Sequence, residues 1–471
     1  MKKIIFIIFF GMIYYAHSQI ITIKDENTNE PIEMVSISSE NPKAYTKTNT
    51  KGQAEIKNFI GSIKISLRSI GYKTETFKYS DIESKSYVIF LKPTSIDVDE
   101  VVVSASRWIQ PSNIVPARVI SISPKEINLQ NPQTAADLLN VSGEVFIQKS
   151  QQGGGSPMIR GFATNRLLYS VDGVRMNTAI FRAGNIQNVI SLDPFAIEKT
   201  EVLFGPSSVM YGSDAIGGVM SFQTLTPQLS FSDKQFITGK AIMRYSSANN
   251  EKTGHFDINV GWENWALLTS LSYNDFGDLK MGSDGPDEYL RKFYVERQDG
   301  KDIVINNEDP LIQKPSAYSQ MNIMQKVRYF SADKWDIQYG FHYSETSTYS
   351  RYDRHIRYKN GLPRYGEWNY GPQKWMMNNL NISNNSTNLF YDQMTLRLAQ
   401  QFFEESRISR DINKNNREVR TEKVDAYSVN LDMVKSFTDN NNFLYGVELI
   451  WNDVKSLGVN EIGRASCRER V

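Results

Sequence analysis

The chain has little cysteine and little histidine, and both shortages narrow its possible chemistry. It contains one Cys and four His among 471 residues. The single thiol is Cys467, so the sequence predicts no disulfide. His17 lies just after the apolar N-terminal run, and His255, His342 and His355 show neither metal-ligand nor catalytic-triad spacing. We therefore expect no enzyme, no catalytic residue, no metal site and no cofactor.

Excess charge of one sign and long apolar runs are also lacking. Lys and Arg number 53 against 52 Asp and Glu, which leaves a net charge of +1. This even balance gives no electrostatic reason to expect a nucleic-acid partner. The longest apolar run, from Ile4 to Tyr15, is shorter than the roughly 20 residues of a membrane-spanning helix. Membrane insertion would therefore require a β-barrel, which also satisfies every backbone group in lipid.

The N-terminus has the pattern of an export signal. Lys2 and Lys3 precede the apolar run, and Ala16-His17-Ser18 follows it as an A-x-S cleavage site. We predict a secretory signal peptide over residues 1–18. No cysteine lies near the cleavage site, so a lipoprotein anchor is not expected.

Strand-forming residues interrupted by turn residues dominate residues 193–222. The run from Ile197 to Phe204 favours a strand, and Gly205-Pro206 forces a turn after it. Gly217-Gly218 would let two backbone segments approach closely before a further strand. Composition alone would predict only a compact β-rich domain with tight turns.

The amino-acid sequence of this segment closely resembles the end of the plug domain of TonB-dependent outer-membrane receptors. The positions that fit the family phrase are Glu198, Glu201, Gly205, Pro206, Ser208, Tyr211, Gly212, Ala215, Gly217, Gly218 and Val219. Two upstream landmarks also match, Arg160-Gly161 and Asp172-Gly173-Val174-Arg175. The resemblance implies a plug domain over residues 111–226. The arginines expected to pair with carboxylates on the barrel wall are Arg160, Arg166, Arg175 and Arg182.

Two local patterns within the plug have simple interpretations. Thr134 can cap a short helix that runs through Leu139, and Pro132 stands just before it. Three adjacent glycines, Gly153 to Gly155, could suggest a phosphate cradle. No Gly-Lys-Ser/Thr sequence follows them, so we exclude a nucleotide-binding loop.

Residues 19–93 alternate β-branched and polar residues between turns, which predicts a small β-sandwich. Pieces such as ITIKDENTNEPIEMVSIS resemble the carboxypeptidase-regulatory-like domain that precedes some of these receptors. Such a domain carries no catalytic set, so its name implies no activity.

An acidic segment followed by three valines leads into the plug. An extended segment of this kind can add as a strand to the sheet edge of another protein, and such backbone pairing can transmit a pull. It resembles the TonB box of these receptors, which implies a TonB-type energy-transducing protein as a partner. The candidate residues are Asp97, Val98, Asp99, Glu100, Val101, Val102, Val103, Ser104 and Ala105. A linker that ends in an ordinary strand is the alternative.

Long amphipathic strands occupy residues 230–460. Phe256, Ile258 and Val260, for example, alternate with Asp257 and Asn259. A strand between lipid and a wet lumen requires this period of two, but a soluble antiparallel sheet has it too. The connections favour the barrel, because short turns alternate with long loops. The expected short turns are 263–264, 331–334, 385–388 and 438–442, and the expected long loops are 277–319, 347–374 and 404–421.

Nine strands are visible by Val454, whereas the family's barrel has about 22 around a plugged lumen. We therefore expect a C-terminally truncated fragment of a longer receptor. Its terminal string, residues 461–471, resembles a translated sequencing adapter, and we expect it to be an artefact. The predicted fold is mainly β, with a small β-sandwich, an α+β plug domain and the first part of a 22-stranded transmembrane β-barrel.

The resemblance implies a receptor in the outer membrane of a Gram-negative bacterium that actively takes up a scarce solute. The plug sequence over residues 160–194 looks more like that of the haem and haemoglobin receptors than that of the glycan importers. The siderophore receptors are nearly as similar. The expected partners are therefore outer-membrane lipid and a small extracellular ligand: haem, a haem protein or a siderophore. A passive porin or adhesin barrel and a glycan importer stay open as alternatives.

Three residues of a predicted extracellular loop are candidate ligand contacts. Tyr352, His355 and Tyr358 are of the types that commonly hold haem iron. For His355, solvation or packing within the loop is the alternative.

Overall fold

The computed structural model describes residues 19–69, 72–93, 101–102, 110–111, 117–163, 166–176, 188–438, 441–460 and 464–469. The chain divides into two compact units, Met1–Glu100 and Val101–Val471. Among the described residues, no helix is both long and apolar enough to cross a membrane. The predicted signal peptide lies outside the described residues.

The first unit has a three-stranded sheet, in the order β4-β1-β7, and a four-stranded sheet, in the order β3-β2-β5-β6. Its elements are β1 (Ile20–Asp25), β2 (Ser36–Glu40), β3 (Lys43–Lys47), β4 (Gln53–Glu55), η1 (Lys57–Phe59), β5 (Ile65–Arg68), β6 (Glu75–Phe77), α1 (Tyr79–Ser84) and β7 (Val88–Leu91). Ile21, Ile23, Ile37, Ile65 and Leu67 are fully buried. They occupy every second position of their strands, as a strand with one covered face requires.

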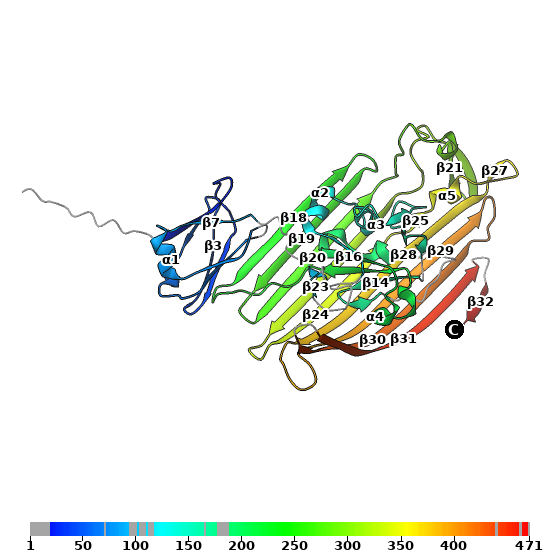
Figure 1. Cartoon of the computed structure of the whole chain (residues 1–471). Coiled ribbons are helices and arrows are strands. Elements are labelled where there is room, and N and C mark those ends of the chain that lie inside the picture. The colour runs from blue at the N-terminus through cyan, green and yellow to red at the C-terminus, as the bar shows by residue number, and fades with distance from the viewer. Residues whose placement is uncertain are drawn as a thin grey trace, which may run out of the picture. The chain divides into compact units, whose positions relative to one another are not determined.

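The second unit begins with the plug, which mixes short helices with two small sheets (Figure 1). Five strands form a sheet in the order β10-β16-β17-β14-β15, and three form a sheet in the order β11-β12-β13. The elements are β8 (Val101–Val102), β9 (Gln110–Pro111), β10 (Val119–Ile122), α2 (Pro124–Gln130), α3 (Ala135–Asn140), β11 (Phe146–Gln148), β12 (Ser156–Ile159), β13 (Phe162–Ala163), β14 (Leu167–Val171), β15 (Val174–Arg175), η4 (Asn188–Ser191), η5 (Pro194–Ala196), β16 (Ile197–Phe204), α4 (Ser208–Tyr211), η6 (Ser213–Ala215) and β17 (Gly218–Thr224).

Local chemistry accounts for two of these plug elements. Thr134 caps α3, because its hydroxyl accepts a hydrogen bond from the Asp137 backbone N–H at 3.2 Å. The expected strand from Ile197 to Phe204 forms as β16 and pairs with β17. A Cβ on Gly218 would lie 2.5 Å from the Leu203 carbonyl oxygen, so only glycine permits this pairing.

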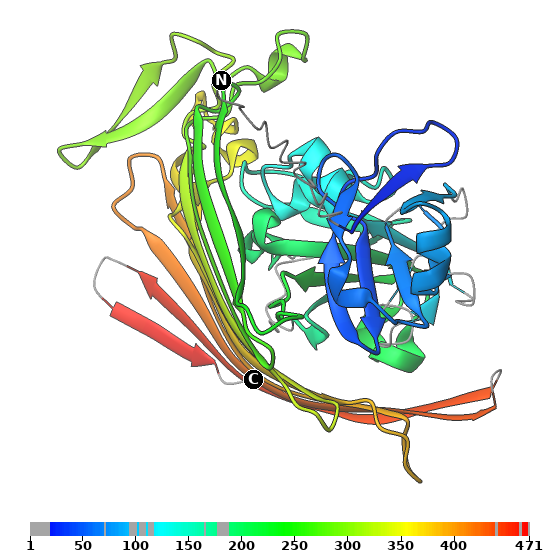
Figure 2. The same cartoon turned by 90° about the vertical axis from the view of Figure 1, so that its left-hand side faces the viewer.

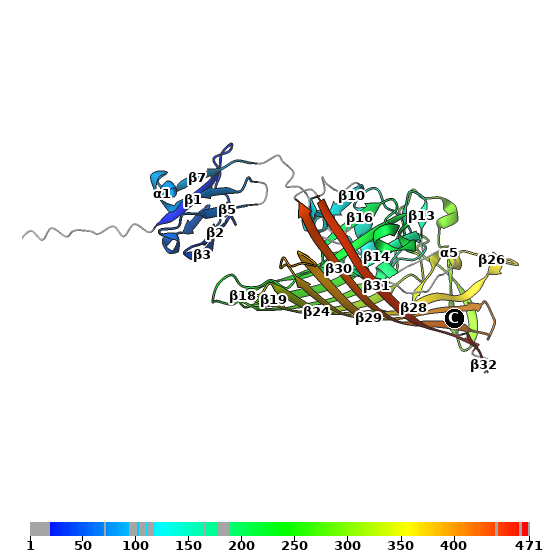
Figure 3. The same ribbon diagram turned by 60° about the horizontal axis from the view of Figure 1, so that its bottom comes forward.

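Nine long antiparallel strands then form a curved wall, and the plug lies on its concave side (Figure 2). The strands are β18 (Phe236–Ser246), β19 (Glu251–Gly261), β20 (Trp265–Phe276), β23 (Tyr318–Phe330), β24 (Trp335–Thr346), β28 (Tyr365–Asn384), β29 (Gln393–Asp411), β30 (Glu418–Thr438) and β31 (Asn441–Asn460). Each pairs with the next one in this order (Figure 3). In the terminal string, the backbone of β32 (Arg464–Glu469) pairs with β31.

The wall is inverted relative to a water-soluble sheet. On β19, Glu251, Thr253, His255 and Asp257 are buried, whereas Phe256 is 47% exposed. The polar side chains therefore lie under the plug, and the apolar ones point away from it. A soluble sheet would bury the opposite face, so the burial pattern supports a barrel wall between lipid and a covered lumen.

The outer face of the wall carries a continuous apolar band. One cross-strand row consists of Ile337, Ile382, Leu396, Leu431 and Val447, and the next consists of Tyr339, Leu380, Leu398, Val429 and Leu449. Nearer the long loops the same face becomes charged. There Lys374 pairs with Glu345 at 3.3 Å, and Lys423 pairs with Glu404 at 2.9 Å. These pairs mark one edge of the band.

The long loops contain structure of their own. Between β20 and β23 lie η7 (Asp287–Tyr289), β21 (Phe293–Gln298) and β22 (Lys301–Asn306). Between β24 and β28 lie β25 (Tyr349–Ser350), α5 (Tyr352–His355), β26 (Tyr358–Lys359) and β27 (Leu362–Pro363). The connections β19–β20 and β23–β24 are short, as expected.

The expected long loop over 404–421 is wrong. β29 continues to Asp411 and β30 begins at Glu418, so only residues 412–417 connect them. Polar cross-strand contacts hold this extension together, such as the one between the Ser406 and Thr421 hydroxyls at 3.1 Å. Strands beyond the apolar band need no apolar face, so hydrophobic alternation did not indicate them.

Surface labelling tests which connections face outward. In the complete receptor, we expect a cysteine at Asp299 or Asn360 to react with a membrane-impermeant maleimide on whole cells, because the long loops of such barrels are extracellular. A cysteine at Asp333, in the β23–β24 turn, should react only after the outer membrane is permeabilised. Reaction of the Asp333 site on intact cells would contradict this assignment of sides.

Candidate functional site: the plug and barrel interface

The β14–β15 hairpin presents its turn to the wall. Asp172 (φ 51°) and Gly173 (φ 79°) form a two-residue Asp-Gly turn of the kind that matches strand twist. The Asp172 carboxylate lies 2.8 Å from Lys326 Nζ of β23 and 3.4 Å from His342 Nε2 of β24. It also accepts a hydrogen bond from the Thr224 backbone N–H at 2.9 Å. One plug carboxylate therefore joins two wall strands to the plug sheet.

Asp172 keeps its charge despite burial. Its side chain is only 9% exposed, and burial alone would raise its pKa. Lys326 and the nearby His342 outweigh that effect and hold the pKa of Asp172 below its usual range. The turn therefore carries a carboxylate at neutral pH.

The rest of the hairpin extends the contact across the wall. A Cβ on Gly173 would lie 2.6 Å from Arg397 Nε of β29, so the turn packs directly on that strand. Gln401 Nε2 of β29 donates to the Arg175 carbonyl at 2.8 Å. The Arg175 guanidinium reaches Glu448 of β31 at 3.7 Å, which is the expected kind of arginine–wall pair.

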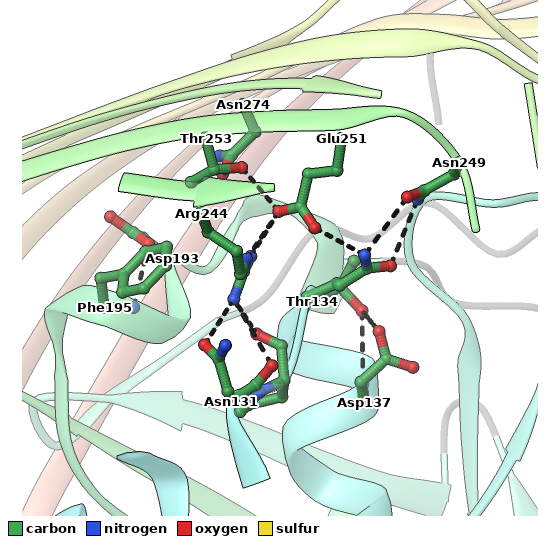
Figure 4. Close-up of polar contacts among 12 residues, drawn as sticks. Asn131, Thr134, Asp137, Asp193, Phe195, Arg244, Asn249, Glu251, Thr253 and Asn274 are labelled. Atoms are coloured by element: carbon green, nitrogen blue, oxygen red, sulfur yellow. Dashed lines mark hydrogen bonds and ion pairs between the residues drawn. The ribbon is translucent and has the colours of Figure 1, made fainter. Parts of the chain in front are cut away.

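A second contact forms around the fully buried Glu251 of β19 (Figure 4). Arg244 of β18 donates to Glu251 from Nε at 2.7 Å and to the Pro132 carbonyl of the plug from Nη1 at 3.0 Å. Gln133 Nε2 of the plug donates to Glu251 Oε2 at 2.5 Å. Thr253 Oγ1 donates to the same carboxylate at 2.6 Å. The wall carboxylate thus fixes the α2–α3 connection of the plug.

A third contact joins Asp193 of the plug to the wall. Ser272 Oγ donates to Asp193 Oδ2 at 2.5 Å and lies 2.7 Å from His255 Nδ1. His255 Nε2 lies 2.8 Å from Asp257 Oδ2. Burial raises the pKa of Asp193. This series of hydrogen-bonded side chains resembles a catalytic triad only in its residue types. Ser272 is 3% exposed, and its hydroxyl is hydrogen-bonded to both Asp193 and His255.

A cavity of about 30 Å³ lies between plug and wall, and its polar lining includes Asp193, Ser270, Asn322 and His342. This volume suits one water molecule with several polar partners.

The other arginines expected at the wall lie elsewhere. Arg160, with φ 47°, is exposed, and its guanidinium lies 5.5 Å from the centre of the Phe204 ring within the plug. Gly161 follows it with φ 83° in the turn to β13. Arg166 is exposed, and Arg182 lies outside the described residues.

The two glutamates of the family phrase have structural partners inside the plug. Glu201 is fully buried and pairs with Lys199 Nζ at 2.9 Å. Glu198 accepts from the Thr226 backbone N–H at 3.1 Å.

The turn residues of the phrase form a compact loop against Arg175. Gly205, with φ 93°, donates its N–H to the Gly217 carbonyl at 3.3 Å. Pro206 is exposed, and Ser208 begins α4. Tyr211 is buried, and its carbonyl accepts from Arg175 Nη2.

The two remaining glycines of the phrase also sit at close approaches. A Cβ on Gly212, with φ 82°, would lie 3.2 Å from Arg175 Nη2. A Cβ on Gly217 would lie 2.5 Å from Phe162 Cβ.

Most of the predicted TonB box lies outside the described residues. Asp97 to Glu100 and Val103 to Ala105 are not described. The backbone of Val101–Val102 pairs as β8 with Gln110–Pro111.

The three candidate ligand residues do not share one environment. His355 is 6% exposed, and its Nε2 donates to the Trp368 carbonyl at 3.2 Å. Burial and the nearby Arg291 lower the pKa of His355 to about 4, so the ring is neutral at pH 7. Tyr352 is half-buried, which raises its pKa. Tyr358 alone is well exposed, at 58%.

Sequence reasoning missed the wall side of the interface. Glu251, Lys326 and Ser272 each occupy an inward position of a period-two strand. That position predicts a lumen-facing side chain but not which plug atom it meets.

Two sequence families match the chain. The TonB-dependent Receptor Plug Domain matches residues 112–219, and the CarboxypepD_reg-like domain matches residues 22–103. Among curated proteins, the vitamin B12 transporter BtuB of Vibrio vulnificus strain CMCP6 is 35% identical over 216 residues, which cover 39% of this chain and 34% of that protein. The hemin receptor of Yersinia pestis is 32% identical over 128 residues, which cover 27% of this chain and 18% of that protein.

Solved structures share the fold at low sequence identity. The copper transporter OprC aligns with a TM-score of 0.54 at 14% identity, over 72% of this chain and 47% of that one. The siderophore receptor PiuA of Acinetobacter baumannii aligns with a TM-score of 0.52 at 14% identity, over 79% and 51%. The chain spans about a third of the length of the BtuB proteins it matches. The chain therefore contains a TonB-dependent receptor plug domain and a CarboxypepD_reg-like domain, and it is similar to TonB-dependent receptors of the Gram-negative outer membrane.

Proposed function

We propose that this chain is part of a receptor that binds a scarce solute outside the cell and admits it when the plug is displaced. The observation that carries the proposal is the seating of the plug. Asp172, Arg175 and Asp193 hold it against the concave face through charged and polar contacts. A lumen of this width would leak if it were empty, so a held but displaceable plug suits gated uptake.

Energy for the displacement would come through residues 97–105. A TonB-type partner would pair with this segment by strand addition and pull on the chain that leads into the plug. The short β8–β9 pairing involves only Val101–Val102 on one side and Gln110–Pro111 on the other, so exchange for a partner strand would disrupt little structure.

For the ligand we propose haem or an iron-siderophore. The likeness to the hemin receptor over 128 residues and the plug wording support haem. The likeness to a vitamin B12 transporter keeps a cobalamin as a second candidate.

An enzymatic role has little support. The relatives are named as transporters and receptors. The Ser272 hydroxyl is buried and hydrogen-bonded to Asp193, so it is not available as a nucleophile. The passive porin alternative differs from the proposal in one measurable property, since a porin needs no energy-transducing partner.

Deleting residues 97–105 tests energy coupling. In the complete receptor we expect the deletion to leave membrane insertion and ligand binding intact and to abolish uptake, because the partner loses its strand. Val102→Pro should act in the same direction, since proline removes a backbone donor. Growth on hemin as the sole iron source and binding of hemin to cells provide the two readouts. Unchanged uptake in the deletion strain would favour the porin.

Replacing the buried wall carboxylate tests the plug seat. Glu251→Ala removes the acceptor shared by Gln133, Arg244 and Thr253, and leaving such donors buried typically costs about 3–5 kcal/mol. We expect a looser plug and greater sensitivity of cells to large antibiotics that the outer membrane normally excludes.

Asp275→Ala is the matched control for this variant. Asp275 of the neighbouring strand β20 is an exposed carboxylate on the face of the wall that points away from the plug. It should leave permeability unchanged. Equal sensitivity of the two variants would show that Glu251 does not retain the plug.

A further inference from the structure

An unpaired arginine lies inside the loop between β20 and β23. Arg291 is 2% exposed, and its position is fixed by three hydrogen bonds. Its N–H donates to the Pro310 carbonyl at 2.7 Å, and its carbonyl accepts from Asn307 Nδ2 at 2.8 Å. Its Nε donates to the Lys314 carbonyl at 2.5 Å. The side chain is therefore held in place and is not a mobile surface cation.

Among the described residues, the end of this side chain has no carboxylate in ion-pair contact, although Asp278 lies near enough to favour its charged form. In the described part of the chain, no acceptor lies within hydrogen-bonding reach of the buried Nη1, and no carboxylate forms an ion pair with Arg291. Burial lowers the pKa of Arg291 to about 10, which still leaves the guanidinium charged at neutral pH. A buried cation without a partner is costly, so its presence in a folded loop needs an explanation.

Aromatic rings connect this cation to the surface. The guanidinium lies 5.9 Å from the centre of the Phe293 ring. The Tyr358 ring meets Phe293 edge-on at 5.0 Å and is 58% exposed. Lys314 Nζ lies 5.0 Å from the Tyr294 ring, which adds a second cation beside an aromatic surface. We call Arg291, Phe293, Lys314 and Tyr358 the Arg291 cluster.

We propose that the Arg291 cluster binds the carboxylate of a planar, anionic ligand, with Arg291 as its counter-ion and with Phe293 and Tyr358 against its flat face. This deepens the proposed function and rests on it. A planar acid would supply both the missing acceptor and a surface for the rings. The neighbouring His355 is neutral and bonded to Trp368, so the cluster recognises charge and shape and does not ligate iron.

Hemin and its dimethyl ester test the proposal directly, because they share one ring system and differ in their two carboxylates. We expect the purified complete receptor to bind hemin at least about tenfold more tightly than the ester, as loss of a charge-assisted hydrogen bond requires. Arg291→Gln should bind both equally, whereas Arg291→Lys should keep part of the preference. Quenching of intrinsic tryptophan fluorescence measures the affinities.

Arg357→Gln is the matched control, because Arg357 is exposed in the adjoining loop. It should keep the wild-type ratio. We also expect Arg291→Gln without ligand to melt at no lower temperature than wild type, because it removes an unpaired buried charge. If Arg291 had only a structural role, Arg291→Gln would lower the melting temperature and leave the ratio of the hemin and ester affinities unchanged.

Several results would overturn the inference. They are equal binding of hemin and ester by the wild type, a wild-type ratio in Arg291→Gln, or no binding of either compound. Should Arg291→Gln fail to fold, the wild-type ratio and a weaker binding of both compounds by Tyr358→Ala decide. The dependence of uptake on residues 97–105 is measured in a separate experiment. The failure of this inference is therefore distinguishable from the failure of the proposed receptor function.

Discussion

The structure depends on one constraint: the wall strands turn their polar faces inward, and those faces must be covered by polar partners. Glu251, Asp257 and Lys326 lie in the interior, where an unpaired charge costs several kcal/mol. The plug supplies Gln133 to Glu251 and Asp172 to Lys326. Plug and wall therefore stabilise each other in the closed state, and water would have to take the place of each partner if they separated.

The same constraint makes a gate possible. Apolar contacts do cross the interface, since Trp375, Met377 and Phe403 of the wall join the core of the plug. The charged and hydrogen-bonded contacts differ from these, because water can replace each one at a net cost of about 1.5–3 kcal/mol for a bond to a charged group. A pull that breaks them one after another meets a smaller barrier than one that separates a purely apolar core.

The architecture could be predicted because the strands alternate apolar and polar residues and because the plug sequence resembles a known family. The alternation around Phe256 predicted strands, and the glycines of the family phrase marked backbone approaches such as the one at Gly218. The prediction failed at 404–421, where strands continue on polar cross-strand contacts that leave no hydrophobic pattern. Alternation reports which face meets lipid, so it is silent wherever a strand leaves the apolar band.

The site was less predictable than the fold, because its partners are far apart in sequence. Lys326 meets Asp172 across 154 residues, and no local pattern in either segment indicates the other. Arg291 shows the limit most clearly: an arginine in a polar loop gives no sign in sequence that it will be buried. What identifies it is a missing partner, which only a folded loop can reveal. A ligand carboxylate that pairs with this buried charge would lower its free-energy cost. That gain exists only in the bound state, so it distinguishes a binding site from an ordinary surface.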